Sequence, residues 1–301
     1  RGTAWPRPVG ARRGRPGQVV HKSRCGSRNG IATAKRKGDT VTLPDYEYRG
    51  LMAEAWDLLR GDTSRWADRF FFLDLIHRYG QPVLDVGCGT GRLLLDYLAQ
   101  GIDIDGVDNS PEMLAICRRK GEALGLTPTV YEQYIERLAL PRRYRTIIVP
   151  SSSLQLVVDP EAAQEALRCL VAHLEPGGAL CASIMTLWRK GDLLESTFEQ
   201  SAQRSDGATI HRVSHSRYDP ATACEDLEDL YQVIVDGAVV AEERHSRAPA
   251  VRSYTQEQAR TLFKQAGLVN VRLFREFTFD PAEQGDTLFT VVGVKMKPES
   301  H

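Results

Sequence analysis

Apolar positions along the chain follow two different spacings, and the change between them divides the sequence. Up to about residue 188, short apolar runs alternate with stretches in which apolar residues recur every three or four positions. The wider spacing predicts amphipathic helices, and a short apolar run bounded by turn residues predicts a buried strand. Strand and helix in alternation predict an α/β fold, in which a parallel sheet carries helices on both faces.

The individual elements of this first region can be stated as residue ranges. Helices are predicted over 48–59, 66–77, 93–98 and 161–174, and a further helix begins at Pro111, where proline is favoured. Strands are predicted over 82–86, 102–107, 129–131, 146–149 and 179–184. The sequence Glu175-Pro176-Gly177-Gly178 is expected to end the last of these helices.

After about Trp188 the pattern changes to β-like segments over 208–217, 224–235 and 239–245, with turn sequences between them. This predicts an antiparallel β meander inserted at about residues 195–250. Thr255 and Gln258 have the spacing of a capping box, which predicts a helix that ends at Gly267. Two closing strands are expected over 269–277 and 287–295.

The balanced charge of the 301-residue chain hides an uneven distribution. Residues 1–40 hold eight Arg and three Lys against Asp39, a net charge of +10, so the remainder carries −10. An Arg-, Gly- and Pro-rich segment without apolar spacing cannot bury enough surface to fold. We therefore expect a disordered basic extension over 1–40 and a folded domain over 41–301. A nucleic-acid-binding arm, a targeting peptide and residues outside the true domain are the competing explanations of the extension.

Composition also excludes several classes of protein. No apolar run approaches the roughly 20 residues that a membrane-spanning helix needs, so no membrane partner is expected. The six cysteines form no CxxC pair and show no zinc-site spacing, so no metal is expected. Scattered cysteines of this kind favour a reducing, cytoplasmic setting.

A glycine loop, Gly87-Cys88-Gly89-Thr90-Gly91, connects the strand over 82–86 to a helix. Glycine lets the backbone approach a ligand closely, and the amides at a helix start face that ligand. A dinucleotide-binding loop would place its third glycine at position 92, which is Arg92. Asp85 would repel a pyrophosphate, but it suits a ligand with an ammonium and a sulfonium. S-adenosylmethionine (SAM) carries both charges and no phosphate.

Asp108 ends the strand over 102–107, 17 residues after Gly91. A carboxylate at this place can accept hydrogen bonds from both hydroxyls of a ribose, because it offers two acceptor oxygens. A plain turn acid before Asn109-Ser110-Pro111 is the alternative interpretation. The glycine loop alone is weak evidence, but the loop with the acid at this spacing favours an adenosine-containing ligand.

These residues resemble two motifs of the class I SAM-dependent methyltransferase family. Residues 83–91 look like its first motif, residues 107–113 look like its second, and residues 174–178 look like the turn before its fifth strand. The resemblance covers roughly 46–188 and, more loosely, 254–295. It implies a Rossmann-like, seven-stranded methyltransferase sheet whose last strand is antiparallel, with SAM as the cofactor.

The resemblance and the motifs together give a predicted set of cofactor-binding residues. They are Tyr48, Trp56, Asp85, Gly87, Cys88, Gly89, Thr90, Gly91, Asp108, Asn109, Met113, Gln133, Tyr134, Ile135, Pro150 and Ser151. Gln133 and Tyr134 replace the family's usual Gly-Asp pair beside the adenine. Met113 is either an apolar lid on the adenine or ordinary helix core. Tyr48 and Trp56 either close over the methionine end of the cofactor or belong to a helix core.

The acceptor is less constrained by the sequence. Methyl transfer depends largely on positioning, with a base added where the acceptor must lose a proton, and the catalytic residues are unknown. His211 and His215 in the predicted meander are candidate bases. Pro150-Ser151-Ser152-Ser153 stands where base-amino methyltransferases have Asn/Asp-Pro-Pro-Tyr/Phe, and no Pro-Cys nucleophile for cytosine methylation is present.

Charge and the inserted meander favour one class of acceptor. The acidic folded region opposes phosphate binding, which dominates affinity for nucleic acid. An inserted antiparallel sheet resembles the lids of small-molecule methyltransferases. We therefore expect methyl transfer to N or O of a small-molecule acceptor. The alternatives are an RNA-associated or non-catalytic SAM-binding protein and an NAD-dependent oxidoreductase. The oligomeric state is not predicted.

Overall fold

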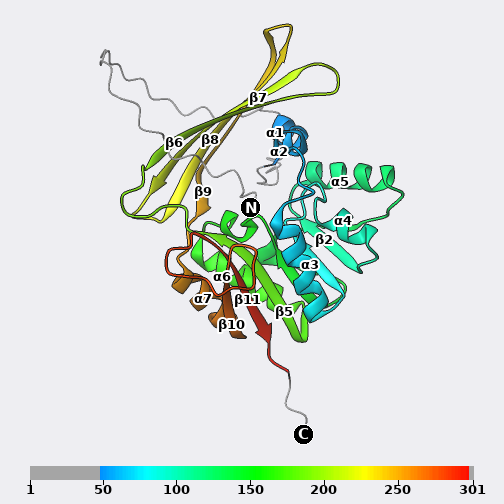
Figure 1. Ribbon diagram of the computed structural model, residues 1–301, viewed down its shortest axis with the longest axis vertical. Coiled ribbons are helices and arrows are strands. Elements are labelled where there is room, and N and C mark those ends of the chain that lie inside the picture. The colour runs from blue at the N-terminus through cyan, green and yellow to red at the C-terminus, as the bar shows by residue number, and fades with distance from the viewer. Residues whose placement is uncertain (1–47, 298–301) are drawn as a thin grey trace, which may run out of the picture.

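The computed structural model describes residues 48–297 (Figure 1). The expected basic extension, 1–40, lies outside the described residues. The helices are α1 (Gly50–Glu54), α2 (Trp56–Arg60), α3 (Ala67–Tyr79), α4 (Leu94–Ala99), α5 (Pro111–Ala123), α6 (Pro160–Ala172), α7 (Gln256–Gln265) and the 3-10 turns η1 (Ile135–Arg137) and η2 (Ser153–Leu156). The strands are β1 (Val83–Val86), β2 (Ile104–Asp108), β3 (Thr129–Glu132), β4 (Tyr144–Val149), β5 (Leu174–Met185), β6 (Glu195–Gln203), β7 (Thr209–Asp219), β8 (Cys224–Val235), β9 (Ala238–Arg252), β10 (Leu268–Arg275) and β11 (Leu288–Lys295).

Seven strands form one sheet in the order β10-β11-β5-β4-β1-β2-β3. Strands β1 to β5 pair in parallel, and β11 runs antiparallel to both of its neighbours, β5 and β10. From β1 the chain adds β2 and β3 on one side of the sheet, and it then returns from β3 to place β4 on the other side of β1. The strand order therefore reverses between β1 and β4. Ligands of open α/β sheets bind at such a switch point, beyond the carboxyl ends of the strands. The predicted Rossmann-like seven-stranded sheet is confirmed.

Alternate residues of the central strands feed two hydrophobic cores, one on each face of this sheet. Leu84 and Val86 of β1 belong to the core that packs under α6 and α7. Val83 belongs to the core that packs under α3, α4 and α5. This arrangement follows from the period of two in a strand, which sends successive side chains to opposite faces. Both faces are therefore covered, as the apolar runs of the strands require.

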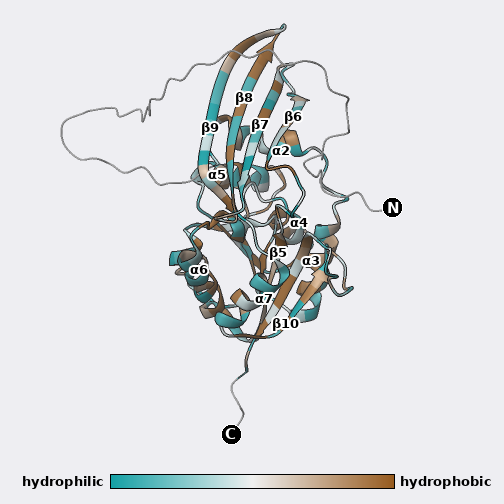
Figure 2. Cartoon of the chain, turned by 90° about the vertical axis from the view of Figure 1, so that its left-hand side faces the viewer, coloured by the Kyte–Doolittle hydropathy of each residue, from teal (hydrophilic) through white to brown (hydrophobic). Residues whose placement is uncertain are grey.

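A second, four-stranded sheet has the order β6-β7-β8-β9, and all of its neighbours are antiparallel. It stands above the larger sheet, with α1 and α2 beside it (Figure 1). Met52 and Ala55 of these helices pack against Ile210, Tyr231 and Val233 of the sheet. The far tip of β8 and β9 has the colour of hydrophobic residues in Figure 2, and Val239 and Val240 are exposed there.

Several elements differ from the expectations. The helix expected over 48–59 is two short helices that meet at Ala55. The helix expected over 161–174 ends at Ala172, and the expected turn 175–178 lies within β5, where pairing with β4 shifts register. The pattern does not predict strand β6, because this strand lies at an exposed edge of its sheet and is almost wholly polar. Strand β9 extends beyond its expected range to Arg252. Among residues 48–297, no helix is long and apolar enough to span a bilayer.

Candidate active site

The glycine loop leaves β1 and turns tightly against the end of β2. The amides of Gly87 and Cys88 both donate to the carbonyl of Val107, at 2.8 and 3.1 Å. Gly87 has a φ of +68°, and a Cβ there would lie 2.6 Å from Oγ of Ser153. Both the left-handed conformation and the close approach exclude larger residues. The loop therefore presents bare backbone at the carboxyl edge of the sheet.

Asp108 ties this loop to the end of β2. Its Oδ2 accepts from the amide of Gly89 at 2.9 Å, and its Oδ1 accepts from the amide of Ser110 at 2.9 Å. Burial raises the pKa of Asp108, and these backbone donors oppose the rise. Each carboxylate oxygen has a second lone pair, so the side chain can still accept hydrogen bonds from a ligand. Asp108 is thus both a loop anchor and an available acceptor.

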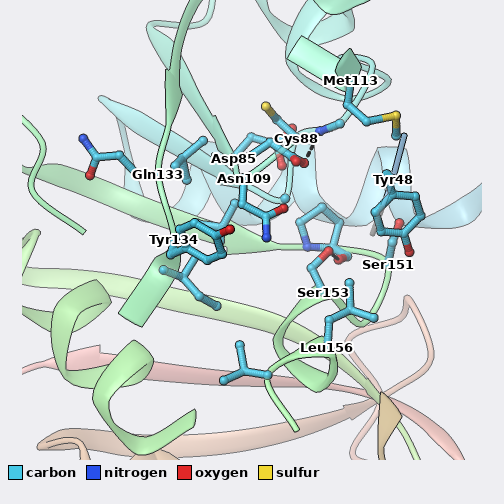
Figure 3. A pocket seen from close by; sticks show the side chains of 18 of the residues that line it. Tyr48, Asp85, Cys88, Asn109, Met113, Gln133, Tyr134, Ser151, Ser153 and Leu156 are labelled. Carbon is cyan, nitrogen blue, oxygen red and sulfur yellow. Dashed lines mark hydrogen bonds between the residues drawn. The ribbon is translucent and has the colours of Figure 1, made fainter. Parts of the chain in front are cut away.

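A cavity of about 340 Å³, here called the first cavity, opens above the loop. Its wall includes every predicted cofactor-binding residue except Gly91. Gly91 instead faces the packing between α4 and α5, because a Cβ there would lie 2.6 Å from Sγ of Cys117. Figure 3 shows Gln133 and Tyr134 on one side of the cavity and Tyr48 on the other. The sequence motifs therefore meet at one place in the fold.

Asp85 lies at the inner end of the first cavity with an unsatisfied acceptor. The residue is 1% exposed, and its Oδ1 has no hydrogen-bond partner among the described residues. Burial raises the pKa of Asp85 to about 7, and the nearby Asp108 carboxylate adds to the rise, whereas Arg92 opposes it. A buried polar atom without a partner is costly. The site is therefore built for a ligand that brings a donor or a positive charge.

Comparison with known proteins gives consistent matches. Residues 83–178 match a family model described as a methyltransferase domain. The dTDP-3-amino-3,6-dideoxy-alpha-D-glucopyranose N,N-dimethyltransferase of Streptomyces fradiae is 27% identical over 232 residues, which cover 75% of this chain and 86% of that enzyme. These matches show that the chain is a SAM-dependent methyltransferase with the class I fold. SAM is accordingly its cofactor, and a nicotinamide-dependent oxidoreductase is set aside.

Solved structures share the fold of this methyltransferase. A sugar N-methyltransferase from Streptoalloteichus sp. superposes with a TM-score of 0.65 at 20% identity, over 90% of this chain and 100% of that one. An amino pentose methyltransferase from Micromonospora echinaspora, solved with SAM bound, gives a TM-score of 0.60 at 19% identity, over 84% and 99%. Both likenesses extend over most of the chain, so the similarity of fold is not confined to the SAM-binding motifs.

The methyltransferase has a second cavity of about 340 Å³ between the four-stranded sheet and the helices α1 and α2. Tyr48, Trp56 and Arg60 line both cavities and form the wall between them. The rings of Tyr48 and Trp56 meet edge to face at 4.9 Å, and the Arg60 guanidinium lies 4.2 Å from the Trp56 ring centre. Burial lowers the pKa of Arg60 to about 10, with the Arg92 charge adding to the effect.

The candidate bases His211 and His215 lie away from both cavities. Residues Arg212, Ser214 and Ser216 of β7 line the second cavity, so the alternate residues point to the opposite face of the sheet. There His211 Nδ1 hydrogen-bonds Ser201 and His215 Nδ1 hydrogen-bonds Thr197, each at 2.8 Å. The geometry therefore does not bring either histidine to the site.

Motifs do not predict some features of the first cavity: the contributions of Arg92 and Arg247, and the backbone contacts of the predicted residue Gln133. Arg92 pairs with the fully buried Asp68 and lies 5.1 Å from the Trp66 ring centre. Gln133 lines the first cavity, but its amide group exchanges two hydrogen bonds with the backbone of Ala139, at 2.7 and 3.1 Å. Arg247 reaches the first cavity from β9. No local pattern in the sequence joins these distant segments.

Proposed function

We propose that this methyltransferase transfers the methyl group of SAM to a nitrogen or oxygen atom of a small-molecule acceptor held in the second cavity. The observation that carries the proposal is the common wall of Tyr48, Trp56 and Arg60 between the two cavities. A reaction between two ligands needs their reacting atoms side by side, and adjoining cavities provide that arrangement. The volume of the second cavity lies at the lower end of the range of small-molecule sites, about 300 to 1,000 Å³.

The residues of the first cavity fit the charges and hydroxyls of SAM. Asp85 offers its unpaired Oδ1 to a positive group of the cofactor, and Asp108 offers its remaining lone pairs to ribose hydroxyls. The bare backbone at Gly87 and Gly89 allows close approach, with Met113 packed beside Gly89. When bound, SAM supplies an electrophilic methyl group.

The protein's own contribution is to orient the reacting ligands in a site that is shielded from water. Two successive serines after β4, Ser151 and Ser152, have φ values of +54° and +58°. Non-glycine residues rarely hold this conformation, and such outliers gather at sites whose shape is fixed by function. Ser152 is held by a 3.1 Å hydrogen bond from its amide to Oγ of Ser183. This turn keeps Ser151 at the wall of the first cavity.

The activities of two similar proteins support a small acceptor. The Streptomyces fradiae relative is an N,N-dimethyltransferase of a nucleotide-linked amino sugar, and the Streptoalloteichus structure is a sugar N-methyltransferase. The second cavity has polar and aromatic groups suited to such a compound, among them Gln200, Ser214 and Tyr231. Hydroxyl, amide and aromatic side chains fix the orientation of a polar ring better than an apolar wall would.

The direct test offers the full chain methyl-labelled SAM with separate pools of acceptors. One pool contains amino sugars, sugars, amines and phenols, a second contains transfer RNA, and a third contains unfolded protein. We expect label in the small-molecule pool, with one S-adenosylhomocysteine (SAH) released per methyl transferred. Label in RNA alone would contradict the proposal and favour the RNA-associated alternative. SAH binding without transfer to any pool would favour a non-catalytic SAM-binding protein.

A further inference from the structure

Glu225, near the start of β8, is an acidic residue in the wall of the second cavity. It lines the cavity beside Ser216, is half-buried, and hydrogen-bonds the Ser216 side chain. Burial raises the pKa of Glu225, and the neighbouring Asp226 carboxylate adds to the rise. Its surroundings therefore disfavour a negative charge.

The other acid of the cavity is in a different situation. Asp229 is 4% exposed and is paired with Arg212, whose Nη2 lies 2.8 Å from Asp229 Oδ1 and whose Nε donates to the same oxygen at 2.9 Å. Glu225 makes no salt bridge with any residue of 48–297, and its side chain hydrogen-bonds the Ser216 hydroxyl. One of the two acids is thus neutralised within the fold, and the other is not.

An acid that is removed from water without a cation costs free energy unless a ligand supplies the missing charge. A protonated amine supplies that charge together with up to three hydrogen-bond donors. A plain alcohol would bring a hydroxyl and leave the charge of Glu225 uncompensated. The aromatic ring of Phe198 in the same cavity also suits a cation, because the face of such a ring attracts positive charge.

The register of the sheet places Glu225 next to the junction of the cavities. Leu227, which lines the second cavity, pairs directly with Arg247, which lines the first. Glu225 is two residues before Leu227, on the same face of β8. Glu225 itself pairs with Val251, because a register shift lies between these two pairs. An acceptor bound to Glu225 can therefore extend toward the first cavity.

We infer that Glu225 binds an amino group of the acceptor, so that the small molecules this enzyme methylates are amines rather than plain alcohols. The inference rests on the proposed function, because it takes the second cavity to be the acceptor site. It assigns the choice of acceptor to one side chain that is separate from the cofactor residues.

The test compares an amine with the alcohol of the same skeleton. The probes are cyclohexylamine against cyclohexanol and D-glucosamine against D-glucose, each added to the full chain with SAH. Binding is followed by the fluorescence of the chain's tryptophans, since Trp56 and Trp66 line the second cavity. We expect each amine to bind at least about 10-fold more tightly than its alcohol, the usual scale for a hydrogen bond to a charged group.

Three variants assign that preference to the carboxylate. Glu225→Gln should remove it, and Glu225→Asp should retain part of it. Glu228→Gln is the matched control, because Glu228 lies on the same strand but is exposed and points away from the cavity. We expect this control to bind like the wild type. All three variants should bind SAH as the wild type does, which separates an effect on the acceptor from an effect on the fold.

The inference is overturned if no amine binds, if amine and alcohol bind equally, or if Glu225→Gln keeps the preference. It is also overturned if Glu225→Gln weakens SAH binding as much as amine binding. Failure of the proposed function gives another result. In that case no small molecule receives label from SAM. If only the role of Glu225 is wrong, alcohols are methylated as readily as amines, both by the wild type and by Glu225→Gln.

Discussion

The two cavities are about equal in volume, but different kinds of structure line them. Backbone forms much of the first cavity: a glycine loop, strand ends and a left-handed turn lie at the carboxyl edge of the seven-stranded sheet. Side chains that project from alternate positions of three antiparallel strands form much of the second. A backbone site accepts only ligands of one shape, whereas a side-chain site can change its ligand by single substitutions. If the second cavity is the acceptor site, as proposed, cofactor recognition depends on the first cavity and the choice of acceptor depends on the side chains of the second.

The largest effect is expected from a substitution that fills the backbone site. Gly87→Ala places a Cβ 2.6 Å from Ser153 Oγ at a φ of +68°. The clash adds about 1–3 kcal/mol to the roughly 1–2 kcal/mol cost of the left-handed conformation. We expect SAH binding, measured by calorimetry, to be lost or severely weakened.

Gly125→Ala is the matched control for that experiment. Gly125 has nearly the same φ, +69°, but a Cβ there has no neighbour within 4 Å. The control should lower the thermal midpoint slightly and leave SAH affinity unchanged. Equal loss of SAH affinity in both variants would show that backbone strain, not close approach to a ligand, explains the effect of Gly87.

A substitution in the second cavity should separate stability from cofactor binding. Asp229→Asn leaves the Arg212 guanidinium without its charged partner, so we expect a loss of about 1–3 kcal/mol in the free energy of unfolding. Chemical denaturation measures that loss, and SAH calorimetry should show no change. A parallel loss of SAH affinity would mean that the two cavities are not independent.

Asp85 is expected to make two quantities depend on pH in opposite directions: the stability of the ligand-free protein and its affinity for SAH. Its pKa of about 7 lies above the ordinary value of 3.8, so the ligand-free protein is destabilised as pH rises from about 4 to 7. Asp85→Asn should therefore raise the thermal midpoint of the ligand-free protein at about pH 8 but not at about pH 4.

The same substitution should weaken SAH binding by about 10-fold or more, because the ligand's ammonium prefers the ionised carboxylate. Wild-type affinity should rise between about pH 6 and pH 8, and the affinity of Asp85→Asn should be nearly flat over that range. A wild-type affinity that falls with rising pH would contradict the role given to Asp85.

The smallest effect is expected for the histidines of the outer face. His211→Ala with His215→Ala removes two side chains that lie away from both cavities. Surface substitutions of this kind usually change stability by less than about 0.5 kcal/mol. The turnover of SAM with an amine acceptor should match the wild type, and a large loss of turnover would restore the histidines as candidate bases.

The same contrast explains what the sequence could predict. Many residues that line the first cavity can be predicted from the sequence because their requirements are local: glycines where φ is positive, an acid at a strand end, and a proline after the Ser110 cap of α5. The second cavity depends on which residues of β6, β7 and β8 share a face, and β6 was not recognised as a strand. A shift of one residue in a strand reverses its faces. The sequence alone therefore does not show that His211 and His215 face away from the second cavity and that Glu225 lines it.

One calorimetric experiment tests the division between the two cavities most directly: titration of SAH into the wild type, Asp108→Ala and Glu225→Gln. Asp108 accepts from the amides of Gly89 and Ser110 and faces the first cavity, whereas Glu225 belongs to the second. We predict that Asp108→Ala weakens SAH binding by about 1.5–3 kcal/mol and that Glu225→Gln binds SAH as the wild type does. Unchanged binding by Asp108→Ala, or equal loss in both variants, would contradict the account.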